Sequence, residues 1–307
     1  MKNSQLRVFV AIAEHGTIRA AARSLALSQT AVTKSLRELE LDLQVPLLSR
    51  SPQGVRLNEA GLELLRRAKL ILAEVGDARA AIQSLSGQGV ARVHAAVTPA
   101  FSLLCLPDAL QRFHNRYPDA RLTIRDAFVS EMLPMLRDGT IDVAITSLLP
   151  EVLGADLSYE PLGEVAVAIS ARTGAFSRDA YRLADLTGSV WLLDHSHGGT
   201  SERVRRWFAE HNVPLPLQMI ECPSSMASLV LTTQGKAIAP VPQAILSLPW
   251  LAPLLSEIPL EEPLPTMPIG FVKRKGYVLD APVSWFVESA RLAIAAVPGL
   301  NLDRLSE

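Results

Sequence analysis

The sequence has few cysteines and almost no net charge. Its two cysteines, Cys105 and Cys222, are far apart and match no CxxC or zinc-ligand pattern, so we interpret them as packing residues and expect no metal site. The formal net charge of -1 over 307 residues says nothing by itself about partners. The apolar run 8–13 is too short for the core of a signal peptide, so we expect a cytoplasmic protein.

Long hydrophobic runs are also scarce. Residues 237–255 approach the length of a membrane span, but Pro240, Pro242, Pro249 and Pro253 interrupt any helix there. We therefore predict a buried strand followed by short helical turns, and no membrane contact.

The charge is distributed unevenly. Residues 1–89 contain 12 lysines and arginines against 8 acidic residues, a surplus of +4, whereas residues 90–307 contain 18 against 23, a balance of -5. The length indicates two or three domains, at roughly 150 residues each. A basic N-terminal part followed by an acidic remainder favours a nucleic-acid contact in the N-terminal part.

Three short helices are predicted in the first 45 residues. Apolar residues repeat at helical spacing over residues 3–15, Thr17 caps a second helix, and Ser28 caps a third after the tight link 26–28. This is the order of a helix-turn-helix. The third helix has a leucine-rich side and a polar side, formed respectively by Val32, Leu36, Leu39 and Leu43, and by Thr30, Thr33, Lys34 and Arg37. An ordinary solvated face is the alternative reading of this helix alone.

A wing follows the third helix. Residues 50–57 predict two short strands around a Pro-Gln-Gly turn, with an arginine on each side. Hydroxyls, amides and cations are the groups that bind phosphates and base edges. The predicted DNA-binding residues are Ser28, Gln29, Thr30, Thr33, Lys34, Arg37, Arg50, Gln53 and Arg56.

A long helix is predicted from Asn58, which caps it, to about Ser86. Apolar residues recur along it at alternating spacings of four and three, the pattern of a coiled-coil seam. This seam favours dimerisation, with packing inside one domain as the alternative. Its members are Leu64, Ala68, Ile71, Val75, Ala78, Ile82 and Leu85.

The remaining chain alternates strands and helices, which predicts a parallel sheet with helices on its faces. Ligands in such folds bind at the carboxyl ends of strands and near helix N-termini. Hydroxyls at these places favour a small organic anion as ligand, although plain N-capping is the alternative for each. The candidates are Thr98, Phe128, Ser130, Thr146, Ser147, Ser196, Thr200, Ser224 and Ser225.

An enzyme and a plain interaction scaffold are the competing classes. The run 194–199, Asp-His-Ser-His-Gly-Gly, contains the residue types of a catalytic triad. Adjacent residues do not normally converge as a triad does, no G-x-S-x-G motif occurs, and His195 and His197 lack a further ligand at metal spacing. We therefore expect no catalytic site, no metal and no cofactor.

The N-terminal module closely resembles the LysR-type transcriptional regulators. The resemblance rests on LRVFVAIAE at 6–14, AAARSL at 20–25, Ser28-Gln29, Leu39-Glu40, PLLSR at 46–50 and GVRLNEAG at 54–61. The sequence departs at Thr30, where the family commonly has proline, and at Thr33, where it commonly has serine. Leu136 to Ile145 also resembles part of the family's effector domain.

The resemblance implies the whole architecture. We expect an all-α winged helix-turn-helix at 1–58, a dimerisation helix at 59–89, and at 90–307 an α/β effector domain like a periplasmic binding protein. Lobe I of that domain is expected at about 90–160 and 266–307, and lobe II at about 161–265. The implied partners are promoter DNA, a small-molecule effector between the lobes, and further copies of the chain in a homotetramer, with RNA polymerase as a further candidate.

Overall fold

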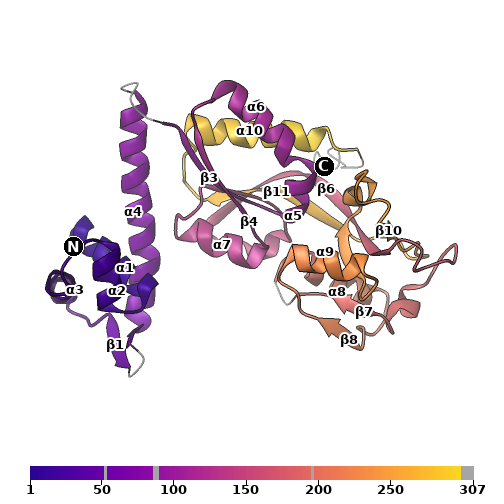
Figure 1. Cartoon of the computed structure of the whole chain (residues 1–307), viewed down its shortest axis with the longest axis horizontal. Helices are drawn as coiled ribbons and strands as arrows, with labels where there is room; N and C mark the ends of the chain where they lie inside the picture. Colours follow the sequence, from indigo (N-terminus) through magenta and orange to yellow (C-terminus); the bar gives the residue numbers. More distant parts are fainter. Residues whose placement is uncertain (52–53, 86–89, 195–196, 299–307) are drawn as a thin grey trace. The chain divides into compact units, whose positions relative to one another are not determined.

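The computed structural model describes residues 1–51, 54–85, 90–194 and 197–298. Two compact units make up this part of the chain, one formed essentially by residues 1–90 and the other by the residues that follow. Figure 1 shows the elements of each unit, which are described separately below.

The first unit begins with the three predicted helices, α1 (Asn3–His15), α2 (Ile18–Ser24) and α3 (Gln29–Leu43). Gly16, with a φ of 69°, ends α1 in the left-handed conformation that glycine adopts without strain. The hydroxyls of Thr17 and Ser28 accept backbone N–H groups at the starts of α2 and α3. The predicted caps are therefore confirmed.

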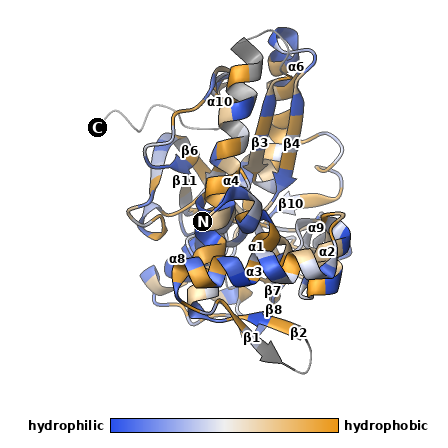
Figure 2. Ribbon diagram, turned by 90° about the vertical axis from the view of Figure 1, so that its left-hand side faces the viewer, coloured by the Kyte–Doolittle hydropathy of each residue, from blue (hydrophilic) through white to orange (hydrophobic). Residues whose placement is uncertain are grey.

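The three helices enclose a small apolar core. Val32, Leu36 and Leu39 of α3 are buried in it, and Leu43 packs at its edge. Ala21 and Ala22 of α2 are also buried, and their small side chains permit close approach of a neighbouring helix. In Figure 2, α3 accordingly shows both hydrophobic and hydrophilic residues along its length.

The wing consists of β1 (Leu48–Ser51) and β2 (Gly54–Leu57), which pair antiparallel. Asn58 joins this hairpin to the long helix α4 (Glu59–Leu85). Its side-chain amide donates to the Pro46 carbonyl at 2.7 Å, and its side-chain oxygen accepts the Gly61 N–H at 2.8 Å. One side chain therefore fixes both the return of the chain and the start of α4.

The second unit is an α/β domain. Its strands are β3 (Arg92–Val97), β4 (Arg121–Asp126), β5 (Val143–Ser147), β6 (Leu157–Arg172), β7 (Val190–Leu192), β8 (Gln218–Ile220), β9 (Ala239–Pro242), β10 (Leu255–Glu257) and β11 (Thr266–Arg274). Its helices are α5 (Pro99–Leu104), α6 (Leu106–Arg116), α7 (Val129–Arg137), α8 (Thr200–Glu210), α9 (Ser225–Thr233) and α10 (Ala281–Ala295). Short 3₁₀ helices lie at Pro150–Val152, Leu183–Leu186 and Gln243–Ser247.

The main sheet has the strand order β10-β6-β11-β5-β3-β4, and β9 also pairs with β6. β3 pairs parallel with β4 and β5, whereas β11 is antiparallel to β5 and β6. We call the part around β3, β4 and β5 lobe I, and the part around β7, β8, β9 and β10 lobe II. The long strands β6 and β11 run side by side between the lobes.

One expectation from the sequence was wrong in detail. The sheet is mixed rather than parallel, because the first half of the 16-residue strand β6 pairs antiparallel with β11 and its second half pairs antiparallel with β9 and β10. Pro161 and Gly163 interrupt the apolar pattern of this long strand. Between β3 and β4, α5 and α6 are separate helices, because Pro107 removes a backbone donor after the break at Cys105.

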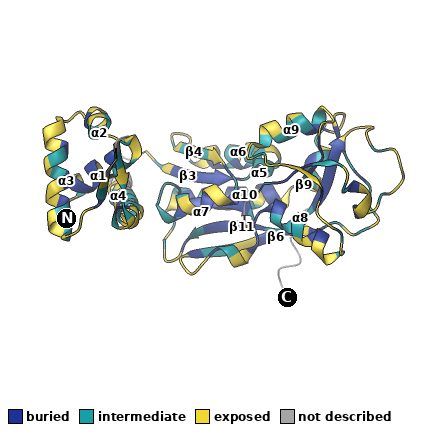
Figure 3. Ribbon diagram, turned by 90° about the horizontal axis from the view of Figure 1, so that it is seen from below, coloured by how far each residue is buried: buried dark blue, intermediate teal, exposed yellow. Residues whose placement is uncertain are grey.

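Helices cover both faces of the lobe I sheet. α6 and α10 pack on one face around Phe113 and Phe286, and α7 packs on the other face through Met132 and Leu136. Lobe II has its own core around Trp191 and Trp207. Figure 3 shows β3 and β11 mostly buried between these layers. Because the helices cover the faces of the sheet, the carboxyl ends of β3, β4 and β5 remain available for functional side chains.

Candidate DNA-binding face and effector cavity

The side of α3 opposite its leucines is a shallow groove in the surface of the first unit. Thr30, Lys34 and Arg37 are exposed there. The groove is lined by Gln29, Thr30, Thr33, Lys34, Arg37, Glu38 and Leu41. The predicted polar face is therefore a continuous surface on one helix.

The polar side chains of this face are of two kinds: hydroxyls that hydrogen-bond to the backbone of the same helix, and the cations Lys34 and Arg37. The Ser28 hydroxyl accepts the Ala31 N–H at 3.1 Å, and the Thr33 hydroxyl donates to the Gln29 carbonyl at 2.9 Å. Lys34 lies 4.0 Å from Glu38, an exposed pair that contributes little to stability. Arg37 forms no ion pair with any described residue. Arg37 and Lys34 are thus the cations best placed to meet a polyanion.

The wing contributes one described cation. Arg56 on β2 is exposed, and its carbonyl accepts a bond from the Ser49 hydroxyl. Gln53 lies outside the described residues, as does the side chain of Arg50, although the backbone of Arg50 pairs with Val55 in the hairpin.

The predicted seam of α4 divides between two environments. Ala68 is 0 % exposed and Leu64 is half-buried, because both pack into the core that α1 closes. The predicted place of Ala68 in a subunit interface is therefore corrected, because its small side chain belongs to the core of its own unit, whereas Leu64 is only partly covered by that core. Ile71, Ala78 and Ile82 are exposed and Val75 is half-exposed, while the side chain of Leu85 lies outside the described residues.

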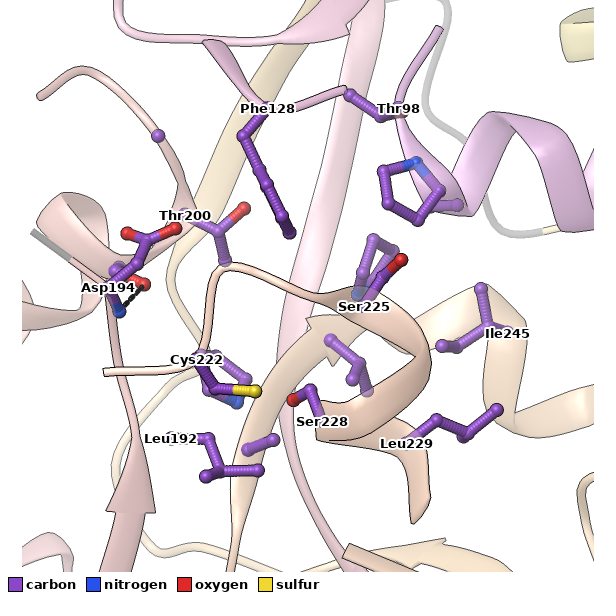
Figure 4. A pocket seen from close by; sticks show the side chains of 18 of the residues that line it. Thr98, Phe128, Leu192, Asp194, Thr200, Cys222, Ser225, Ser228, Leu229 and Ile245 are labelled. Carbon is purple, nitrogen blue, oxygen red and sulfur yellow. Dashed lines mark hydrogen bonds between the residues drawn. The ribbon is translucent and has the colours of Figure 1, made fainter. Parts of the chain in front are cut away.

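The second unit contains a cavity of about 270 Å³ between its lobes. Thr98 follows β3, Asp126 ends β4 and Ser147 ends β5, so lobe I contributes the carboxyl ends of its parallel strands. Lobe II contributes the first residues of α8 and the inner face of α9. Figure 4 shows Thr98 and Phe128 on one side of the cavity, and Thr200, Ser225 and Cys222 on the other.

The structure brings five of the nine predicted ligand-binding residues to this cavity: Thr98, Phe128, Ser147, Thr200 and Ser225. Thr146 is fully buried, because neighbouring residues of a strand point to opposite faces. Ser130 is exposed on α7, and Ser224 caps α9, so neither lines the cavity. Ser196 lies outside the described residues.

Several lining residues were missed from the sequence. Asp126 ends β4, Asp194 comes two residues after β7, and Cys222 comes two residues after β8. A search for acids and thiols at the ends of strands, like the one made for hydroxyls, would have found all three residues. Ser102, Ser170 and Ser228 also line the cavity, but no local pattern marks them.

Oxygens of the chain itself accept backbone donors at the starts of α5, α7 and α9, whereas α8 begins after Gly199 without a side-chain cap. The Thr98 and Ser224 hydroxyls cap α5 and α9 by accepting the N–H groups of Phe101 and Ala227. The Glu131 carboxylate accepts the Phe128 N–H at 3.1 Å. These groups satisfy backbone donors that would otherwise bind a ligand's oxygens.

The start of α8 carries a carboxylate of its own. Glu202 accepts the Gly198 N–H at 2.6 Å and pairs with Arg206, and these two interactions lower the pKa of Glu202 below its ordinary value. At the lobe I side, burial and the neighbouring Glu131 raise the pKa of Asp126. Asp126 and Glu131 therefore place acidic groups at the lobe I side of the cavity, whereas the charge of Glu202 is paired with Arg206.

The charges of the lining do not match the expected anionic effector. Asp126 and Asp194 line the cavity, and no lysine, arginine or histidine is among the described residues that do so. Within the described chain, no group of three histidines, cysteines or acids is arranged to hold a metal. The described helices also include none with the length and apolar character needed to cross a bilayer.

Comparison with known families assigns both units. Residues 4–62 match the bacterial regulatory helix-turn-helix protein model of the lysR family, and residues 86–294 match the LysR substrate binding domain. Members of this family are transcriptional regulators and not enzymes.

Individual relatives agree with this assignment. The chain is 27 % identical over 290 residues to the transcriptional regulator TdcA of Escherichia coli K12, which covers 94 % of this chain and 92 % of TdcA. It is 31 % identical over 251 residues to GbpR of Rhizobium radiobacter, covering 78 % and 81 %.

Solved structures agree as well. The crystal structure of the LysR regulator CbnR matches with a TM-score of 0.70 and 25 % identity, covering 95 % of this chain and 99 % of CbnR. Full-length CbnR complexed with its target DNA matches with a TM-score of 0.68 and 25 % identity, covering 95 % of this chain and all of CbnR. The chain belongs to the LysR family of DNA-binding transcriptional regulators, and its second unit is the effector-binding domain of that family.

Proposed function

We propose that α3 is the recognition helix, which enters the major groove with Arg37 and Lys34 toward the bases or phosphates. The observation that carries this proposal is the exposed polar face of α3, directly opposite the leucines that hold the helix in its core. Gln29 and Thr30 lie at the N-terminal end of the same face, where helix-turn-helix proteins contact base edges. Arg56 of the wing binds the DNA backbone.

The exposed half of the α4 seam pairs two copies of the chain. Ile71, Val75, Ala78 and Ile82 retain heptad spacing beyond the core of the first unit, and exposed apolar side chains at this spacing favour a partner helix. A dimer places two recognition helices about 34 Å apart, one turn of DNA. Two dimers form a tetramer, which works on promoter DNA in the cytoplasm and contacts RNA polymerase there.

The cavity between the lobes holds the effector. A bound small molecule contacts both lobes at once through residues such as Thr98 and Thr200. It changes DNA binding only to the extent that it binds one arrangement of the lobes more tightly than another.

A salt titration tests the DNA-binding function. The full-length protein is titrated with the intergenic DNA upstream of its own gene and with scrambled DNA of equal length. We expect binding about a thousandfold tighter to the native fragment, with affinity that falls steeply as salt rises. Equal binding to both fragments, in the presence and absence of a cell extract that supplies effectors, would contradict a sequence-specific function at this site.

A further inference from the structure

The cavity combines an apolar wall with negative charge. Leu192, Leu229 and Ile245 form part of its wall, and the carboxylates of Asp126 and Asp194 approach it from different lobes. Figure 4 shows Asp194 beside Thr200, with the leucines and Ile245 below. Because no lysine, arginine or histidine is among the described lining residues, an anionic group on a ligand would meet no opposite charge among them.

Oxygens of the chain itself lie at the helix starts beside the cavity. A helix N-terminus binds an anion through its unpaired N–H groups. Thr98 and Ser224 each accept one such N–H, at α5 and α9, and Glu131 accepts the N–H of Phe128 just before α7. The start of α8 has no side-chain cap, but the Glu202 carboxylate accepts the Gly198 N–H beside it and pairs with Arg206.

Asp126 is a lining carboxylate that a ligand can reach, since the residue is exposed. It accepts no hydrogen bond from a described residue. Partial desolvation and the nearby Glu131 raise its pKa, since both disfavour the charged form. A positively charged or strongly donating ligand group would oppose both effects, because it favours the charged form and offsets the repulsion from Glu131.

We propose that this cavity selects a small organic molecule without negative charge, whose donor group, best a protonated amine, meets Asp126 while its apolar body packs against Leu192, Leu229 and Ile245. The inference rests on the proposed role of the cavity as the effector site, and it replaces the expected organic anion. The lining hydroxyls of Ser147, Thr200 and Ser225 serve as hydrogen-bond acceptors or donors for the uncharged parts of such a molecule.

The two cysteines allow the charge preference to be measured without knowing the effector. Cys222 lines the cavity, whereas Cys105 is buried and its pKa is raised to about 12, so Cys105 reacts poorly. The full chain is treated with two methanethiosulfonates of similar size, one carrying a trimethylammonium group and one a sulfonate. In each case the Cys222 thiolate attacks the thiosulfonate sulfur, forms a disulfide and releases methanesulfinate.

The measured quantity is the ratio of the two rates, in which the thiolate fraction of Cys222 cancels, divided by the same ratio for free glutathione methyl ester, which removes the difference in intrinsic reactivity between the reagents. We expect the cationic reagent to be favoured on the order of tenfold at low salt, and the preference to shrink as salt rises. The variant Asp126→Asn should lower the ratio. Asp119→Asn removes the same charge from the loop before β4, away from the cavity lining, and should leave the ratio unchanged.

A ratio near one, or a preference for the sulfonate reagent, would overturn the inference, and so would equal effects of the two variants. The labelling measures only the cavity, whereas the salt titration measures only DNA binding. Failure of the ligand-charge inference is therefore distinguishable from failure of the proposed regulatory function.

Discussion

The aromatic ring of Tyr159 on β6 lies directly against the α-carbon of Gly270 on the neighbouring strand β11. A methyl group added at position 270 would come within 2.5 Å of the Tyr159 ring and would also meet the Glu160 carbonyl. Tyr159 is half-buried, and burial raises its pKa to about 12. The strands that connect the lobes thus approach closely only because position 270 has no side chain.

Gly270→Ala should therefore destabilise the second unit by about 1–3 kcal/mol, the usual cost of overpacking. The free energy of unfolding, measured by urea denaturation, checks this value. Gly188→Ala is the matched control, since an added methyl group there meets nothing within 4 Å. Equal stability of both variants would mean that the Tyr159 ring and the Glu160 carbonyl both move aside without cost.

Arg37→Ala should weaken binding to the native DNA site by about 1–3 kcal/mol and relax one base preference if Arg37 makes a paired contact with guanine. A uniform loss for all sequences, with a shallower salt dependence, would identify a phosphate contact instead. Fluorescence anisotropy with a set of single-base variants separates the two outcomes. Arg178→Ala removes an exposed arginine of the second unit and should leave DNA binding unchanged. If the variant kept both the affinity and the base preference of the wild type, Arg37 would not be a DNA contact.

Ile82→Lys should raise the dissociation constant of the dimer at least about tenfold, since burial of an isoleucine contributes about 1.5–3 kcal/mol. Ile82 is 68 % exposed in the single chain, so the substitution does not disturb the core of its own unit. Sedimentation equilibrium measures the constant. Leu62→Lys is the control, because Leu62 lies on the same helix, is 59 % exposed and is outside the seam. A dimer equally stable in both variants would argue against the α4 interface.

Glu202→Gln should lower the stability of the second unit at neutral pH. The folded-state pKa of Glu202 lies below its ordinary value of 4.5, because the Gly198 N–H and Arg206 favour the carboxylate. Its contribution is therefore present above pH 4.5 and is lost as the pH falls through the lower folded-state pKa. Thermal unfolding should show a difference between wild type and variant at pH 7 that disappears well below pH 4.5. A difference that persists in acid would indicate a steric effect of the amide rather than a charge effect.

Short-range order in this protein was predictable from the sequence. The helices of the first unit begin at Thr17 and Ser28 because these hydroxyls accept N–H groups three residues further on. The division of α3 into a leucine side and a polar side follows from helical periodicity alone. Caps and periodicity depend on residues within about four positions of one another, so each window of sequence contains the information.

Longer-range features were decided by the tertiary structure. Ala68 fits a heptad seam as well as Ile71 does, but only the packing of α1 buries it within its own unit. β6 is longer than the uninterrupted apolar stretch of its sequence, because two different sets of strands pair with its two halves.

The sequence by itself thus determined the family, the helix-turn-helix and the polar face of α3, since those depend on local spacing. The tertiary structure alone decided the chemistry of the cavity. Asp126, Asp194 and Cys222 are up to 96 positions apart in the chain and come to one cavity because separate strands end there. The charge that a ligand meets is a sum over all of these side chains, and only their convergence in space defines it.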